Sequence, residues 1–129
     1  MTTQPIEQPQ TTTSFDLVVP PDAELLRVVR LVASGLASLA PLDLDAVEAV
    51  RVAADELVAT LIQASDGGPV TITFAIGDGT LSIRGRVPIG PGRVFELDPL
   101  TEQILDAVVT THEWLTDEGQ LEGRVEQSL

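Results

Sequence analysis

The chain has 129 residues, of which 43% are hydrophobic, and its 20 Asp and Glu against 7 Arg give a formal net charge of −13 at pH 7. It contains no Cys and no Lys, which excludes a disulfide framework, a cysteine nucleophile and a phosphate-loop lysine. The acidic balance also argues against nucleic acid as a partner, because phosphate binding needs clustered basic groups. A basic protein surface is the better electrostatic match.

Residues 1–13 are rich in Gln, Thr and Pro. This composition predicts a disordered lead-in, because it buries too little apolar area to offset chain entropy. The segment lacks the basic and apolar regions of a signal peptide, and no run approaches the ~20 apolar residues that cross a bilayer. We therefore expect a single domain over 14–129, without membrane contact. A cytoplasmic location is expected, and the absence of Cys fits it.

The first half of the chain predicts one strand and two helices. Residues 14–19 alternate as a half-buried strand that ends at two prolines. Asp22 can cap a first helix that ends before Pro41, with an apolar stripe at Leu25, Val29, Val32, Leu36 and Leu39. A second helix begins at Asp43 or Asp45, either of which can cap it, and runs to about Ser65.

The second half predicts two hairpins separated by a loop and a helix. Alternating residues over 70–76 and 81–87 flank Gly77-Asp78-Gly79. Residues 88–99 are rich in Gly and Pro and predict a loop, followed by a helix to Val108 and a hairpin over 110–125. The expected order is β-α-α-β-β-α-β-β. This order is typical of a two-layer α+β sandwich, with helices on one face of a mixed, mostly antiparallel sheet.

Candidate catalytic residues are few. His112 lies in a predicted strand with no Ser or carboxylate partner at a local spacing, so we expect it to be structural. No hydrolase signature, calcium loop or His-Glu zinc motif is present. In the second helix, however, Glu56 and Thr60 lie one turn apart and share a face. This face is either a candidate site or simply a solvated surface of the helix.

Three fragments in this order resemble a known family. They are Phe15 to Pro20 (FDLVVP), Leu26 to Arg30 (LRVVR) and Val50 to Leu57 (VRVAADEL). The chain is similar over residues 14–127 to the anti-sigma regulatory factors, the RsbW-like serine-protein kinases of the GHKL (histidine kinase-like) ATPase superfamily. The resemblance implies the histidine kinase-like ATPase fold.

The resemblance also implies site residues, which are only partly retained. Glu56 matches the general base of the family's N box, and Thr60 stands where an asparagine holds magnesium, for which a hydroxyl is a poorer ligand. The histidine that is usual four residues further on is Ala64. Gly90 and Gly92 match the two glycines of the adenine motif, but Pro88 replaces the aspartate that accepts the adenine hydrogen bond.

The family's third motif, a glycine-rich phosphate turn, is lost. Residues 98–105 contain no glycine, and Asp98 and Glu102 add negative charge where a triphosphate would sit. The three losses together predict a domain that keeps the fold without competent ATP chemistry, and so no cofactor. ATP and magnesium belong to the alternative, in which the chain is an ATP-dependent protein-serine kinase.

The implied function is partner switching. An anti-sigma domain sequesters a sigma factor, and a STAS-domain anti-anti-sigma protein competes for the same domain. The resemblance makes Arg27 and Arg30 on the first helix candidates for partner contact, against the alternative that they are solvated, and it implies a possible homodimer. Two other functions stay open: the active kinase that phosphorylates the STAS protein on serine, and a non-catalytic assembly domain.

Overall fold

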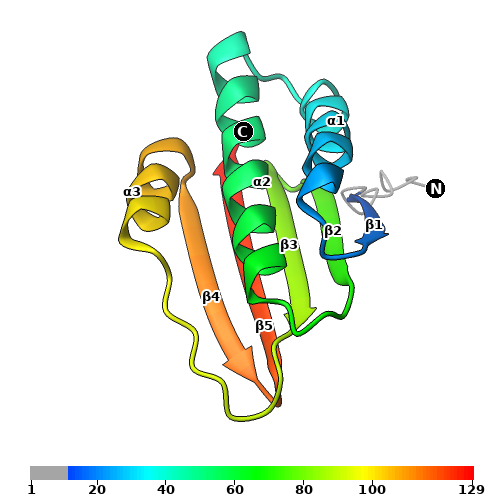
Figure 1. Ribbon diagram of the computed structural model, residues 1–129. Coiled ribbons are helices and arrows are strands. Elements are labelled where there is room, and N and C mark those ends of the chain that lie inside the picture. Colours follow the sequence, from blue (N-terminus) through cyan, green and yellow to red (C-terminus); the bar gives the residue numbers. More distant parts are fainter. Residues whose placement is uncertain (1–11) are drawn as a thin grey trace, which may run out of the picture.

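The computed structural model describes residues 12–129 and has two layers, with helices over one face of a five-stranded sheet (Figure 1). The predicted α+β class is confirmed. The predicted lead-in lies outside the described residues except for Thr12 and Thr13, and Thr13 already belongs to the first strand. The elements are β1 (Thr13–Val19), a 3-10 helix η1 (Ala23–Leu25), α1 (Leu26–Ala37), α2 (Leu44–Ala64), β2 (Val70–Gly77), β3 (Thr80–Pro88), α3 (Pro99–Val108), β4 (Thr111–Asp117) and β5 (Gln120–Ser128).

The sheet has the order β1-β2-β3-β5-β4, and every neighbouring pair is antiparallel. The expectation of a mixed sheet is therefore wrong. The physical reason lies in the second hairpin: β3 and β4 run in the same direction, but β5 lies between them and pairs with both. Each hairpin turn contains two residues with positive φ, Asp78 (53°) with Gly79 (72°) and Glu118 (48°) with Gly119 (77°), as the type I′ hairpin turn requires.

The first helix is shorter than predicted at both ends. Asp22 caps the 3-10 turn rather than α1, accepting a hydrogen bond from the Glu24 backbone N–H at 2.9 Å. At the other end Ser38 donates its hydroxyl to the Gly35 carbonyl at 2.6 Å, which competes with continued helix. Leu39 therefore lies outside the helix and is 71% exposed instead of belonging to the apolar stripe.

The second helix begins at the first of its two predicted start positions. Of the two candidate caps, Asp43 is the one that accepts a backbone hydrogen bond, from the Ala46 N–H at 2.8 Å, while Asp45 lies in the first turn. Among residues 12–129 no helix has the length and apolar character needed to cross a bilayer.

Two glycines let α2 pack closely on the centre of the sheet. Gly85 on β3 is directly opposite Gly123 on β5. A Cβ at Gly123 would lie 2.7 Å from Leu57 Cδ1, and a Cβ at Gly85 would overlap Leu61 Cδ1. Both leucines are fully buried and are one turn apart on α2, so their side chains occupy the space that two Cβ atoms would need.

Candidate functional site

A cavity of about 380 Å³ opens between the second half of α2, the loop over 89–98 and the first turn of α3. Residues spaced by three or four positions lie on one side of a helix, and α2 presents such a row to the cavity. The row consists of Glu56, Ala59, Thr60, Gln63 and Ala64. The cavity thus lies beside the two helix residues that the sequence singled out, Glu56 and Thr60.

The side chains of Glu56 and Thr60 differ in their hydrogen bonds. Glu56 is half-buried, and its Oε2 accepts a hydrogen bond from the Thr101 hydroxyl on α3 at 3.3 Å. The Thr60 hydroxyl instead donates to the Glu56 backbone carbonyl at 2.8 Å. Glu56 therefore presents a carboxylate to the cavity, whereas the only hydroxyl hydrogen of Thr60 is used within its own helix.

The charge of the cavity is negative. Glu56, Glu96 and Asp98 line it, against Arg93 as the cation among the lining residues. Asp98 is also the N-cap of α3 and accepts a hydrogen bond from the Leu100 N–H at 2.8 Å. A helix N-terminus attracts anions, but here a carboxylate of the chain itself already holds that position.

The two glycines predicted for the site are not among the lining residues. Gly90 (φ 87°) and Gly92 (φ 76°) both have the left-handed conformation that favours glycine. Their neighbours Ile89 and Arg93 line the cavity instead. The Ile89 N–H donates to the Gly119 carbonyl at 2.8 Å, so this end of the loop is tied to the β4–β5 turn.

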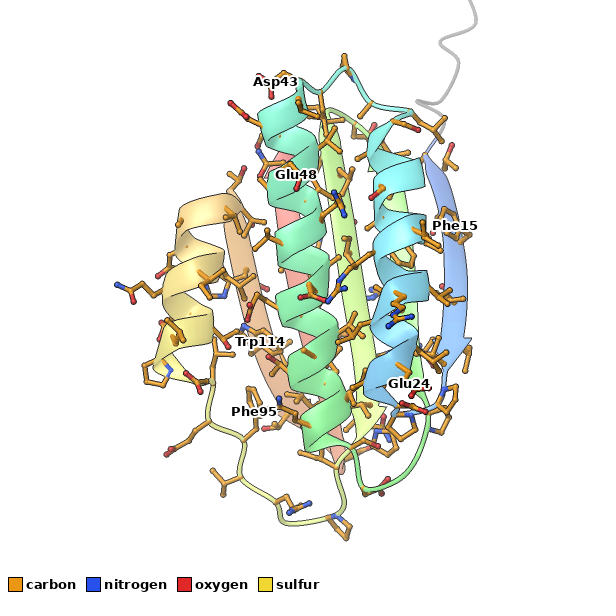
Figure 2. The ribbon with its side chains drawn as sticks, turned by 45° about the horizontal axis from the view of Figure 1, so that its top comes forward. Phe15, Glu24, Asp43, Glu48, Phe95 and Trp114 are labelled. Atoms are coloured by element: carbon orange, nitrogen blue, oxygen red, sulfur yellow. The ribbon has the colours of Figure 1, made fainter. Side chains whose placement is uncertain are left out.

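Sequence reasoning missed the aromatic wall of this region. Phe95, a lining residue from the loop, stacks on Trp114 of β4 with ring centroids 5.5 Å apart (Figure 2). Trp114 is the single Trp of the chain. The two residues are 19 positions apart across α3, and no local pattern relates them.

His112 has a carboxylate partner that no local spacing indicated. Its Nε2 lies 2.6 Å from Asp106 Oδ1 on α3, because the short connection folds α3 back onto β4. Trp114 donates its indole N–H to His112 Nδ1 at 3.2 Å. The accepting Nδ1 carries no hydrogen, so Nε2 is the donor to Asp106. These contacts join α3 to β4, which gives His112 a structural role.

The two arginines proposed for partner contact have different surroundings. Arg30 reaches from α1 to Asp55 on α2, with Nη2 at 2.8 Å and Nε at 2.9 Å from the same carboxylate oxygen. Arg27 is exposed, and within residues 12–129 no carboxylate lies within 4.0 Å of its guanidinium. Arg27 is therefore available to a partner, whereas Arg30 already ties the two helices together.

In the part of the chain that the structure describes, no group of three or more His, Asp and Glu converges to hold a metal ion. The chain matches no protein-family model and no curated protein sequence.

Proposed function

We propose that this chain is a regulatory binding domain of the anti-sigma type, with the histidine kinase-like ATPase fold and without competent ATP chemistry. It sequesters a sigma factor in the cytoplasm and is released when a STAS-domain antagonist competes for the same surface. The observation that carries the proposal is the acidic cavity lined by Glu56 and Thr60, the two helix residues that the resemblance assigns to a nucleotide site.

The residues of this cavity do not fit a magnesium-bound triphosphate. Three carboxylates line it against one guanidinium. A like-charge pair 5–8 Å apart costs about 2–3 kcal/mol at an effective dielectric constant of 20. Magnesium prefers carboxylate and phosphate oxygens in octahedral geometry, and the Thr60 hydroxyl, engaged with its own helix, is a poor substitute for the missing amide. The proposed function therefore includes no phosphoryl transfer.

The surface of α1 supports a binding role. Val28 and Leu31 are 41% and 73% exposed, and Arg27 lies beside them on the same helix without an ion pair to the described residues. Exposed apolar side chains that lie together mark interaction surfaces, and Arg is enriched in protein interfaces. In addition, a net charge of −13 steers the chain towards basic partners and raises the association rate.

Co-purification tests the proposal. The chain is co-expressed with each sigma factor and each STAS-domain protein of its host, and complexes are separated by size-exclusion chromatography. We expect a stoichiometric complex that Arg27→Glu weakens, whereas Arg86→Glu on the other face of the sheet leaves it intact. Arg30 is unsuitable for this purpose, because Arg30→Glu places a second carboxylate beside Asp55. Failure of the wild-type chain to bind any of these proteins at micromolar concentration contradicts the proposal.

The active kinase is the second candidate, and the carboxylate of Glu56 favours it because this half-buried group lines the cavity. Calorimetric titration with ATP and magnesium, repeated with ADP, separates the two functions. Micromolar binding that is lost in Glu56→Ala but kept in Asp78→Asn, a change on the distant β2–β3 turn, supports the kinase. Absence of heat up to millimolar ATP supports the binding domain.

A further inference from the structure

One exposed apolar side chain lines the cavity, and a second lies between two lining residues in the sequence. Val94 lines the cavity and is 88% exposed, and Leu100, between the lining residues Asp98 and Thr101, is 63% exposed. Neither packs against the core formed by the described residues. Exposed apolar groups at the rim of a concave site are a common feature of protein-binding surfaces. The rim thus offers apolar contact to a partner whose side chain enters the cavity.

Among the described residues, none of the three carboxylates that line the cavity forms an ion pair. The hydrogen bond that Glu56 receives is long, at 3.3 Å, which leaves this half-buried group weakly compensated. Arg93 is exposed and, within residues 12–129, has no carboxylate within 4.0 Å of its guanidinium. Partial burial of a weakly hydrogen-bonded carboxylate is unfavourable, so a guanidinium brought in by a partner would find an incompletely satisfied acceptor in Glu56.

We propose that the cavity receives an arginine side chain of the basic protein partner, with the partner's neighbouring aliphatic residues resting on Val94 and Leu100. The guanidinium would lie among the carboxylates of Glu56, Glu96 and Asp98. Arginine fits better than lysine, because its planar fork of five donors can bind carboxylates in pairs. A cavity of about 380 Å³ falls within the size range of sites that enclose a ligand group. The proposal rests on the proposed function for the identity of the partner, but the cavity can be tested without that partner.

The chain contains its own reporter for this cavity. Phe95 lines the cavity and stacks on Trp114, the single Trp (Figure 2). Occupation of the cavity therefore changes the surroundings of an indole only one side chain away. A ligand bound to α1 or to the open face of the sheet does not contact this stack, so the fluorescence change identifies the cavity.

The test uses a blocked tripeptide, acetyl-Leu-Arg-Leu-amide, titrated into the full chain at low salt while Trp114 fluorescence is followed. The control peptide carries citrulline, the neutral analogue of arginine, in the central position. We expect saturable binding of the arginine peptide and a loss of about tenfold, or about 1.4 kcal/mol, with citrulline, because the neutral analogue cannot form charge-assisted hydrogen bonds with the carboxylates. The variant Glu56→Gln/Glu96→Gln should lose a similar factor. The matched variant Asp78→Asn/Asp117→Asn removes the same charge from the β2–β3 turn and from the end of β4 and should bind as the wild type does.

Equal binding of the two peptides, or unchanged affinity in Glu56→Gln/Glu96→Gln, would overturn the proposal, as would the absence of a saturable change at millimolar peptide. Circular dichroism establishes that the variant is folded, so a loss of binding is not a loss of structure. The outcome is separable from that of the proposed function. A chain that captures a sigma factor but ignores the arginine peptide refutes only the cavity proposal, and a chain that binds the peptide but no sigma factor or STAS protein refutes only the anti-sigma function.

Discussion

Alanine at Gly123 tests whether the two paired glycines set the distance between α2 and the sheet. A Cβ at this position would lie 2.6 Å and 2.8 Å from two ring atoms of Trp114 and 2.7 Å from Leu57 Cδ1. Contacts of this length cannot persist, and the indole cannot simply rotate away because Phe95 stacks on it. At Gly85 the added Cβ meets one methyl group of Leu61, which a change of rotamer can move.

The magnitude follows from two opposing terms. Overpacking of a well-packed core costs about 1–3 kcal/mol, while replacing glycine by alanine within a strand recovers roughly 0.5–1 kcal/mol of conformational entropy. For Gly123→Ala, with rigid neighbours on two sides, we expect a net loss of about 1–2 kcal/mol. For Gly85→Ala we expect a smaller loss, of about 0.5–1 kcal/mol, because a single flexible side chain has to adjust.

Urea denaturation followed by circular dichroism measures both losses without relying on the Trp signal, which the substitution itself perturbs. Gly35→Ala is the control of opposite sign: it lies within α1 with no heavy atom within 4 Å of an added Cβ, so it should stabilise the domain by about 1 kcal/mol. A Gly123→Ala variant as stable as the wild type, or a Gly85→Ala variant that loses more than Gly123→Ala, would refute the packing argument.

Three further results are expected. Asp43→Ala removes the cap of α2 and should cost about 1 kcal/mol in urea denaturation, whereas Asp43→Ser should restore most of it; an equal loss in both variants would exclude capping as the cause. A double-mutant cycle on Arg30 and Asp55, which are 43% and 33% exposed, should give a coupling of about 0.2–1 kcal/mol, and a coupling well above this range would contradict a surface pair. Phe95→Leu should shift the emission of Trp114 towards that of a solvated indole, and an unchanged spectrum would exclude the stack.

The sequence predicted those parts of the fold that depend on local chemistry. Over 70–74 the strand pattern alternates, and Val70, Ile72 and Phe74 are all fully buried. The turn at Asp78 and Gly79 has the positive φ angles that its residue types favour. Such features are recoverable because side-chain alternation and turn conformation are decided by a few adjacent residues.

Features that depend on distant residues were not recoverable. The direct pairing of Gly85 with Gly123 follows from the position of β5 between β3 and β4. The sequence of neither strand predicts this pairing. The pair Asp106 and His112 was missed for a related reason. It forms only because α3 packs against β4, so a spacing of six residues across a helix end carries no signal of its own.

The candidate site has one part that the sequence predicted and one part that it did not. Helical spacing placed Glu56 and Thr60 on one face, and that face fronts the cavity. The comparison of short motifs predicted Gly90 and Gly92 as site residues. A loop has no periodicity, so its contacts with the rest of the fold decide which of its residues face the cavity. Here the hydrogen bond from Ile89 to the β4–β5 turn is one such contact. The loop presents Arg93 to the cavity instead.

Asp98 determines which charge the start of α3 presents to the cavity. The sequence identified Asp98 and Glu102 as negative charges at the start of the last helix, and of these two Asp98 lines the cavity. Because its carboxylate accepts the Leu100 N–H, it supplies internally the negative group that a helix N-terminus otherwise takes from a ligand. An incoming phosphate would have to displace this cap, at a cost of about 1 kcal/mol, and approach the remaining carboxylates as well. Asp98 thus caps α3 and supplies the negative group at its first turn, so this helix needs no bound anion there.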